Sequence, residues 1–235
     1  MLYTISSENR TSGSTTNFNL ALPIGIHNVN CITLHEVQLP NTIYNVTSLN
    51  NTVYVDESGT TKTCPITAGS YSITNLCSAV QASLIANASL GYTVTYSSIS
   101  MKITIANSLH TFALLFSNLG TLATELGFDN SNTSTGNTFT GSNIISLYNP
   151  INLFIFVNEI GSHVQTSAGT QFTFKVSLDV NPGNLNTFTS LKFYPQKVHF
   201  GNPRSFQQFN ISLCNESGLV IDTNGINWNV TLEFA

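Results

Sequence analysis

Residues 226–235, INWNVTLEFA, alternate apolar and polar positions without a break. Successive side chains of a β-strand point to opposite faces of its sheet, so this pattern predicts a half-buried strand. Its inner face would carry Ile226, Trp228, Val230, Leu232 and Phe234, and its outer face Asn227, Asn229, Thr231 and Glu233. The only tryptophan of the chain, Trp228, is therefore expected in the core.

Strand patterns also occupy the first 49 residues, in the runs NFNLALPI, NCITLHEVQLP and TIYNV. Proline cannot donate a hydrogen bond to a neighbouring strand, so we expect Pro23 and Pro40 at strand ends. Residues 7–16, SENRTSGSTT, contain no apolar side chain. They predict a loop or a flexible N-terminal arm over about residues 1–16.

The pattern changes over residues 50–128, where helical and strand periods are mixed. A hairpin is predicted around Ser58-Gly59, followed by a helix with Ser72 as its N-cap. A second hairpin follows from residue 92, and then a short helix that ends at Gly127. Residues 50–128 therefore predict a small α+β unit.

The polar run 129–142, DNSNTSTGNTFTGS, is typical of a linker or an exposed loop. Strand patterns then return in NIISLY, INLFIFVNEI, QFTFKVSLDV, TFTSLKFY and FQQFNISLC. The run NLFIFV is apolar on both faces and predicts a central strand. Eight or nine strands in all predict a mainly β protein: a single jelly-roll β-sandwich formed by 1–49 and 129–235, with 50–128 inserted.

Charged residues make up only 8% of the chain, against about 25% in an ordinary soluble domain. The net charge is −4 and the basic residues are scattered, which argues against specific nucleic-acid binding. A polar surface with little charge suits dense packing of like subunits, and also a lectin-like surface. The start of the chain, MLYTISSENR, lacks a signal-peptide pattern, and the apolar run LFIFV is too short to span a membrane.

No motif for phosphate, dinucleotide or zinc-protease chemistry is present, and we predict no catalytic residue, metal or cofactor. Cys31 and His35 would lie about 13 Å apart on a strand, too far to share one ion. The four cysteines are expected as reduced thiols, with Cys77 and Cys214 in the core. A pair of catalytic carboxylates from distant strands, as in a glycoside hydrolase, stays open.

Several segments together resemble a protein family: ITLHEVQLPNTIYNV, ITAGSYSITNLCSAVQASL, LATELGF, INLFIFVNEI and FNISLCNESGLVIDTNGINWNVTLEFA. They are similar to the penton and minor capsid proteins of virophages, polinton-like viruses and related large DNA viruses. The most specific parts are Leu-Gly-Phe at 126–128 and Asn-Gly-x-x-Trp at 224–228.

The resemblance implies a jelly roll, often with an inserted domain, that has no enzymatic activity. Five copies would close each icosahedral vertex of the virion capsid, in contact with the double-jelly-roll major capsid protein and other minor capsid proteins. Assembly would take place in the host cytoplasm or nucleus.

A capsid subunit needs side chains that are covered by its neighbours. The candidate interface residues are Arg10 in the polar arm and Asn227, Asn229, Thr231 and Glu233 on the outer face of the last strand. Tyr3, Tyr44 and Tyr54 belong either to the core or to an interface. The alternative function is a lectin-like or host-attachment β-sandwich, and the inserted unit could itself contact a host.

Overall fold

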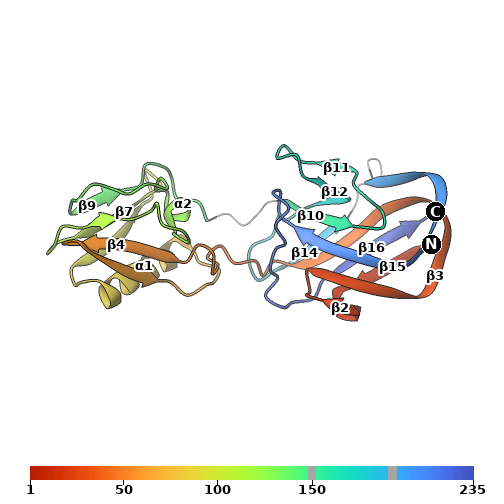
Figure 1. The fold of residues 1–235 in the computed structure, drawn as a ribbon, viewed down its shortest axis with the longest axis horizontal. Helices are drawn as coiled ribbons and strands as arrows, with labels where there is room; N and C mark the ends of the chain where they lie inside the picture. The colour runs from red at the N-terminus through yellow and green to blue at the C-terminus, as the bar shows by residue number, and fades with distance from the viewer. Residues whose placement is uncertain (148–151, 190–194) are drawn as a thin grey trace. The chain divides into compact units, whose positions relative to one another are not determined.

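The computed structural model describes residues 1–147, 152–189 and 195–235 (Figure 1). The described chain forms two compact units, one made of Met1–Ile43 with Pro150–Ala235 and the other of Tyr44–Asn149. The elements of the first unit are β1 (Leu2–Ser6), the 3₁₀ helix η1 (Ser7–Asn9), β2 (Ser12–Gly13), β3 (Asn17–Pro40), β10 (Asn152–Val157), β11 (Val164–Gln165), β12 (Gln171–Phe172), β13 (Phe174–Ser177), β14 (Leu185–Thr189), β15 (Lys197–Cys214) and β16 (Asn229–Phe234). The elements of the second unit are β4 (Thr52–Glu57), β5 (Thr60–Pro65), α1 (Ile73–Asn87), β6 (Tyr92–Ser97), β7 (Lys102–Asn107), β8 (Ala113–Leu114), α2 (Ala123–Leu126) and β9 (Thr138–Thr140).

The first unit is an antiparallel sandwich of two layers, which we call sheet 1 and sheet 2. The long strands β3 and β15 pair along most of their length and curl together from one layer into the other (Figure 1). Sheet 1 has the order β1-β16-β3-β14, and sheet 2 the order β3-β15-β10-β13. Two four-stranded antiparallel layers in these orders are a jelly roll, so the predicted fold class is confirmed.

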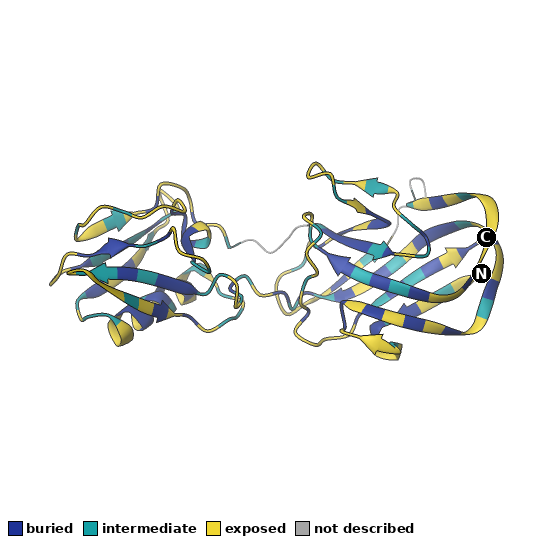
Figure 2. Ribbon diagram, in the orientation of Figure 1, coloured by how far each residue is buried: buried dark blue, intermediate teal, exposed yellow. Residues whose placement is uncertain are grey.

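The core of the sandwich follows from alternation along its strands, visible as blue and yellow bands in Figure 2. Trp228, Val230, Leu232 and Phe234 point inward and are all buried. Trp228 is 1% exposed; its indole Nε1–H donates to the Thr15 carbonyl at 2.8 Å. The predicted inner face of the last strand is thus confirmed, except that the strand begins at Asn229 and Ile226 is 44% exposed.

The prediction that Pro23 ends a strand is wrong, because β3 runs on through it to Pro40. The pairing of β3 with β15 shifts between Phe206/Ile26 and Gln208/Ala21. Pro23 lies in this irregular stretch of β3, where a missing N–H leaves no gap in the hydrogen-bond ladder.

The prediction of a flexible arm is also wrong. Residues 2–6 form β1, which pairs antiparallel with β16. Ile5 and Ser7 are buried, and Thr15 and Thr16 are buried as well. The absence of apolar residues over 7–16 did not mean disorder, because the hydroxyl groups of this segment bond to the sandwich: Thr15 Oγ1 lies 3.0 Å from Thr223 Oγ1.

The second unit packs α1 and short strands around a core of its own. Its two three-stranded sheets have the orders β5-β4-β8 and β6-β7-β9. Both predicted hairpins are present, and Ser72 caps α1 by accepting the Asn75 backbone N–H at 3.2 Å. Gly127 ends α2 with φ +78°, as predicted for its C-terminal glycine.

The polar run 129–142 is not a linker; the alternative prediction, an exposed loop, holds for residues 129–137 but not for residues 138–140. Residues 138–140 form β9, which pairs with β7, and Asn132 accepts the backbone N–H of Ser117 at 3.0 Å. The polar side chains mislead here because the strand is short and its neighbours are supplied from far along the sequence. Residues 143–147 of the predicted strand NIISLY are not a strand, and the end of TFTSLKFY lies outside the described residues.

Candidate interaction surface

The outer face of sheet 1 carries the side chains that the sequence predicts for an interface. Asn229, Thr231 and Glu233 alternate with the buried residues of β16 and point away from the core. In the ladders they stand opposite residues of two neighbouring strands: Ser6, Thr4 and Leu2 of β1, and Gln38, Glu36 and Thr33 of β3. Apart from the exposed Leu2, this face is therefore a polar surface that continues across the three strands.

Hydrogen bonds between side chains tie this outer face together. The hydroxyl oxygens of Thr4 and Thr231 lie 3.0 Å apart, and the Gln38 amide Nε2 donates to the Glu36 carboxylate at 2.6 Å. Cross-strand Thr pairs of this kind stabilise a sheet by about 0.2–1 kcal/mol each. The face is polar and ordered, and most of its side chains are uncharged.

Arg10 and Asn227 lie together at one end of β16. The Arg10 guanidinium donates from Nη1 to the Ser7 carbonyl at 2.7 Å and to Asn227 Oδ1 at 3.3 Å. Ser7 is fully buried and accepts the Trp228 backbone N–H at its Oγ, 3.0 Å away. Arg10 thus fastens the turn after β1 to the segment before β16, which is a structural task within the chain.

The five predicted residues do not form one contact cluster. The structure brings Arg10 and Asn227 together and sets Asn229, Thr231 and Glu233 in a row along β16. Of the tyrosines that were left between core and interface, Tyr44 is 39% exposed, whereas Tyr3 and Tyr54 are half-buried.

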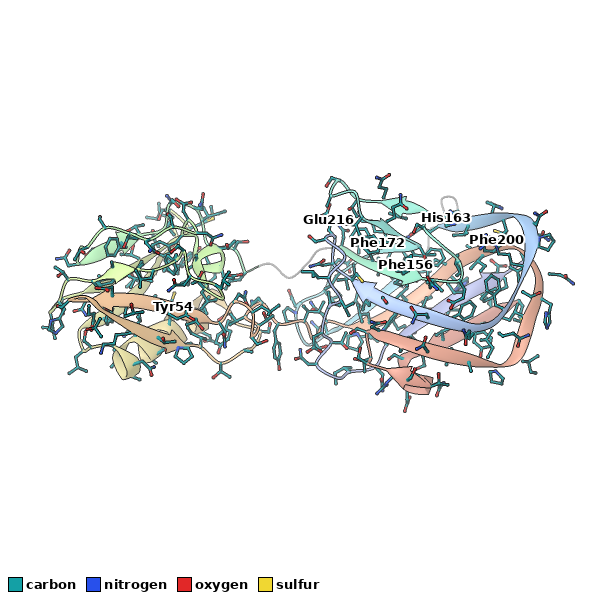
Figure 3. All side chains as sticks on the ribbon, viewed as in Figure 1. Tyr54, Phe156, His163, Phe172, Phe200 and Glu216 are labelled. Atoms are coloured by element: carbon teal, nitrogen blue, oxygen red, sulfur yellow. The ribbon has the colours of Figure 1, made fainter. Side chains whose placement is uncertain are left out.

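The outer face of sheet 2 differs, because part of it is apolar. Phe154 of β10 stacks on Phe172 of β12, with ring centroids 4.7 Å apart. Phe156, also on β10, packs partly buried beside them (Figure 3). The short hairpin of β11 and β12 therefore forms a small third layer, which strand alternation alone did not predict.

The rest of the sheet 2 outer face is a ladder of amides and hydroxyls. The Asn210 amide donates to Asn19 Oδ1 at 2.9 Å, and the Asn19 amide donates to Ser12 Oγ at 2.9 Å. The Ser212 hydroxyl donates to Asn17 Oδ1 at 3.2 Å. Both outer faces of the sandwich are thus rich in uncharged hydrogen-bonding side chains.

The cysteines show the environment of packing residues. Cys64, Cys77 and Cys214 are buried, and burial raises the pKa of each thiol, that of Cys64 to about 11. At neutral pH these thiols are protonated and poor nucleophiles. Cys31 is partly exposed, and its Sγ lies 4.0 Å from His199 Nε2.

Within the described residues, no group of three or more His, Cys, Asp or Glu side chains could hold a metal ion. The Glu57 carboxylate in the second unit accepts the hydroxyls of Ser89 and Tyr92, at 2.5 and 2.8 Å. Burial and this hydrogen bond raise the pKa of Tyr92. The three side chains therefore form a hydrogen-bonded cluster, in which Asn107 also donates to Ser89 Oγ at 3.2 Å.

An apolar depression of about 420 Å³ lies where β1 begins and β16 ends, beside the bend of β3. Met1, Tyr3, Ile24 and Phe234 contribute to its lining, and His27 is the only histidine, carboxylate or cysteine side chain there. In the described part of the chain, no helix is long and apolar enough to cross a membrane.

The first unit thus has the fold of a single jelly roll, with polar outer faces. Among solved structures, the chain is similar to the crystal structure of SeMet-labeled mavirus penton protein, with 10% sequence identity and a TM-score of 0.49. The alignment covers 100% of this chain and 98% of that chain. No protein-family model and no curated protein sequence matches the chain. The jelly-roll assignment rests on the strand order of the first unit.

Proposed function

We propose that this chain is a structural capsid subunit, a penton protein that forms a homopentamer at the five-fold vertices of an icosahedral virion. It contacts a double-jelly-roll major capsid protein and other minor capsid proteins, and it catalyses no reaction. It resides in the virion capsid and is assembled in the host cytoplasm or nucleus. In this proposal Arg10, Asn227, Asn229, Thr231 and Glu233 belong to the subunit interface.

The observation that carries the proposal is the polar, weakly charged outer surface of the jelly roll. Burying an unpaired charge at an interface is costly, whereas hydroxyl and amide groups can exchange water for a neighbour's hydrogen bonds at little net cost. Thr4, Thr231, Asn19 and Asn210 already hold defined orientations through such bonds. Hydroxyl and amide side chains of this kind can therefore be covered by neighbouring subunits without burying an unpaired charge.

In the sequence, the second unit lies between the end of β3, which belongs to sheet 1, and β10, which belongs to sheet 2. We propose that it is an inserted subdomain, for which the sequence indicates residues 50–128, and that it has a role of its own, such as contact with the host. Its separate core supports this, because none of the buried residues of that core belongs to the jelly-roll core.

A lectin-like or attachment module is the second candidate, and Phe156 is the observation that favours it. Phe156 is partly exposed and stands opposite Ser212 in the ladder, and an exposed aromatic ring beside a hydroxyl group can stack on a sugar. If this candidate is correct, a glycan array will identify a ligand and Phe156→Ala will abolish its binding.

The experiment that tests the capsid role mixes the purified chain with the major capsid protein of the same virus. We expect the chain to join the assembled particles and to appear in cryo-electron micrographs at the five-fold vertices only. A chain that stays free of the particles, while binding a glycan through Phe156, would overturn the capsid role in favour of the attachment role.

A further inference from the structure

The two edges of sheet 2 are covered in part by the chain itself. At the β13 edge, the Gln196 side chain bonds to the Lys175 backbone in both directions: its Oε1 accepts the N–H at 2.7 Å and its Nε2 donates to the carbonyl at 2.6 Å. The Asn186 amide donates to the Ser177 carbonyl at 3.0 Å. Side chains thus occupy the positions that an added strand would take.

The other edge of sheet 2, the first part of β3, is covered by the segment before it. The backbone N–H groups of Thr11 and Ser14 donate to the carbonyls of Asn19 and Asn17, at 2.8 and 2.9 Å. β2 pairs with the same stretch of β3. The Lys175–Ser177 stretch of one edge and the Asn17–Asn19 stretch of the other are therefore not free to pair with another chain, and Pro23, a usual guard of exposed edges, lies further along β3.

Sheet 1 differs, since its β1 edge is open. The Phe234 N–H donates to the Met1 carbonyl at 2.7 Å, and the Ser7 N–H to the Trp228 carbonyl at 3.0 Å. Facing pairs in an antiparallel ladder alternate between hydrogen-bonded and non-hydrogen-bonded pairs. Tyr3 and Ile5 therefore also direct their backbone groups to β16. The backbone groups of Leu2, Thr4 and Ser6 face outward, and none of the described residues bonds to them.

The opposite edge of sheet 1, β14, likewise has no backbone partner on its outer side among the described residues. The Asn41 N–H donates to the Asn184 carbonyl at 2.8 Å, just before the ladder between β3 and β14. Alternation then directs Asn186 and Phe188 toward β3, and leaves the backbone groups of Leu185, Thr187 and Thr189 facing outward. Pro40, which has no N–H, stands opposite Leu185, which agrees with a non-hydrogen-bonded pair at that position.

The two open edges match in strand direction and in the faces that they expose, and both are uncharged. Successive antiparallel pairings across β1, β16, β3 and β14 make β14 antiparallel to β1. Neither LYTIS nor LNTFT contains a charge or a proline, the usual guards of an exposed edge. Thr4 and Thr187 both lie on the outer face of the sheet, at the centres of their strands.

We propose that β1 of one copy pairs antiparallel with β14 of the next copy, so that Thr4 lies opposite Thr187 of the partner subunit. The contact joins the sheet 1 layers edge to edge, and it is head-to-tail, the type that closes into a ring by rotation. This inference rests on the proposed pentamer and names the surface that forms it.

Charge substitutions at the facing pair test the contact. Thr4→Lys with Thr187→Lys places like charges opposite each other in every interface, whereas Thr4→Lys with Thr187→Glu places opposite charges there. Within one chain the two positions are separated by β16 and β3, roughly 14 Å, so the charges affect folding of the monomer little. The second variant is thus a matched control for the first.

Analytical ultracentrifugation would measure the concentration at which half of the chain is pentameric. We expect the Lys/Lys variant to raise it about tenfold or more, and the Lys/Glu variant to return it close to the wild-type value. Equal thermal unfolding of dilute monomers would show that both variants fold. If the wild-type chain forms pentamers and the Lys/Lys variant forms them at the same concentration, the edge contact is overturned and the proposed function stands. A wild-type chain that never forms pentamers would overturn both.

Discussion

At the scale of single residues, Trp228 joins the last strand to the start of the chain. Its indole ring lies in an edge-on arrangement 6.1 Å from Phe18, and its N–H bonds to Thr15. Its backbone exchanges two hydrogen bonds with Ser7. One side chain therefore packs the core and fixes the segment that the sequence suggested was a loose arm.

Trp228→Ala should lower the free energy of unfolding by about 3–5 kcal/mol, because it leaves a large cavity and an unpaired Thr15 carbonyl. Urea unfolding followed by circular dichroism would measure the change. Ile226→Ala, two residues away and exposed, should change stability by less than about 0.5 kcal/mol. Similar losses for the two variants would contradict the packing described for Trp228.

The buried thiols predict a loss of stability at alkaline pH. Burial raises the pKa of Cys64 from 9.0 to about 11, and the nearby Glu57 carboxylate adds to the shift. The unfolded thiol ionises at lower pH than the folded one, so this contribution is complete below about pH 9 and is lost as pH rises to about 11. Cys64→Val should make the free energy of unfolding fall less steeply over this range. If the slope of the free energy of unfolding against pH is the same in both proteins, Cys64 is not shielded from solvent in the folded state.

At the scale of elements, local patterns predicted the parts of the fold that depend on near neighbours. The β4–β5 hairpin, α1 with its Ser72 cap and the inner face of β16 all follow from residues close in sequence. β1 and β9 were missed because their partners, β16 and β7, are distant along the chain. In addition, β9 itself lies within a polar stretch of the sequence.

The candidate interface shows the same division. Alternation was enough to place Asn229, Thr231 and Glu233 on an outer face. It could not show that Arg10 contacts Asn227, or that the β1 edge is open while Gln196 covers β13, since these depend on which strands become neighbours. Fold class was therefore accessible from sequence, and the edge contacts were not.

Gly127, which ends α2, should be sensitive to substitution. It has φ +78°, and an added Cβ would lie 2.5 Å from the Asn143 carbonyl oxygen. Gly59 has a similar φ of +80° with nothing within 4 Å. Both alanine variants meet backbone strain, but only Gly127→Ala also meets a clash, so it should be less stable than Gly59→Ala by about 1–3 kcal/mol in urea unfolding. Equal losses would contradict the close approach.

At the scale of the whole molecule, each unit has a separate core and should unfold in its own transition. Trp228, the only tryptophan, lies in the jelly roll, so its fluorescence follows that unit, whereas far-ultraviolet circular dichroism follows both. Gly127→Ala should shift only a transition that fluorescence does not detect. A fluorescence midpoint that moves with Gly127→Ala would show that the units unfold together.

The central claim, that the chain is a capsid vertex subunit, is tested most directly by the native mass of the purified protein. Each chain has a mass of 25.4 kDa, and the proposal predicts a species of five times that mass in native mass spectrometry. The pentamer should also be the form that binds the major capsid protein. A chain that remains a monomer at every concentration, with and without the major capsid protein, would contradict the claim.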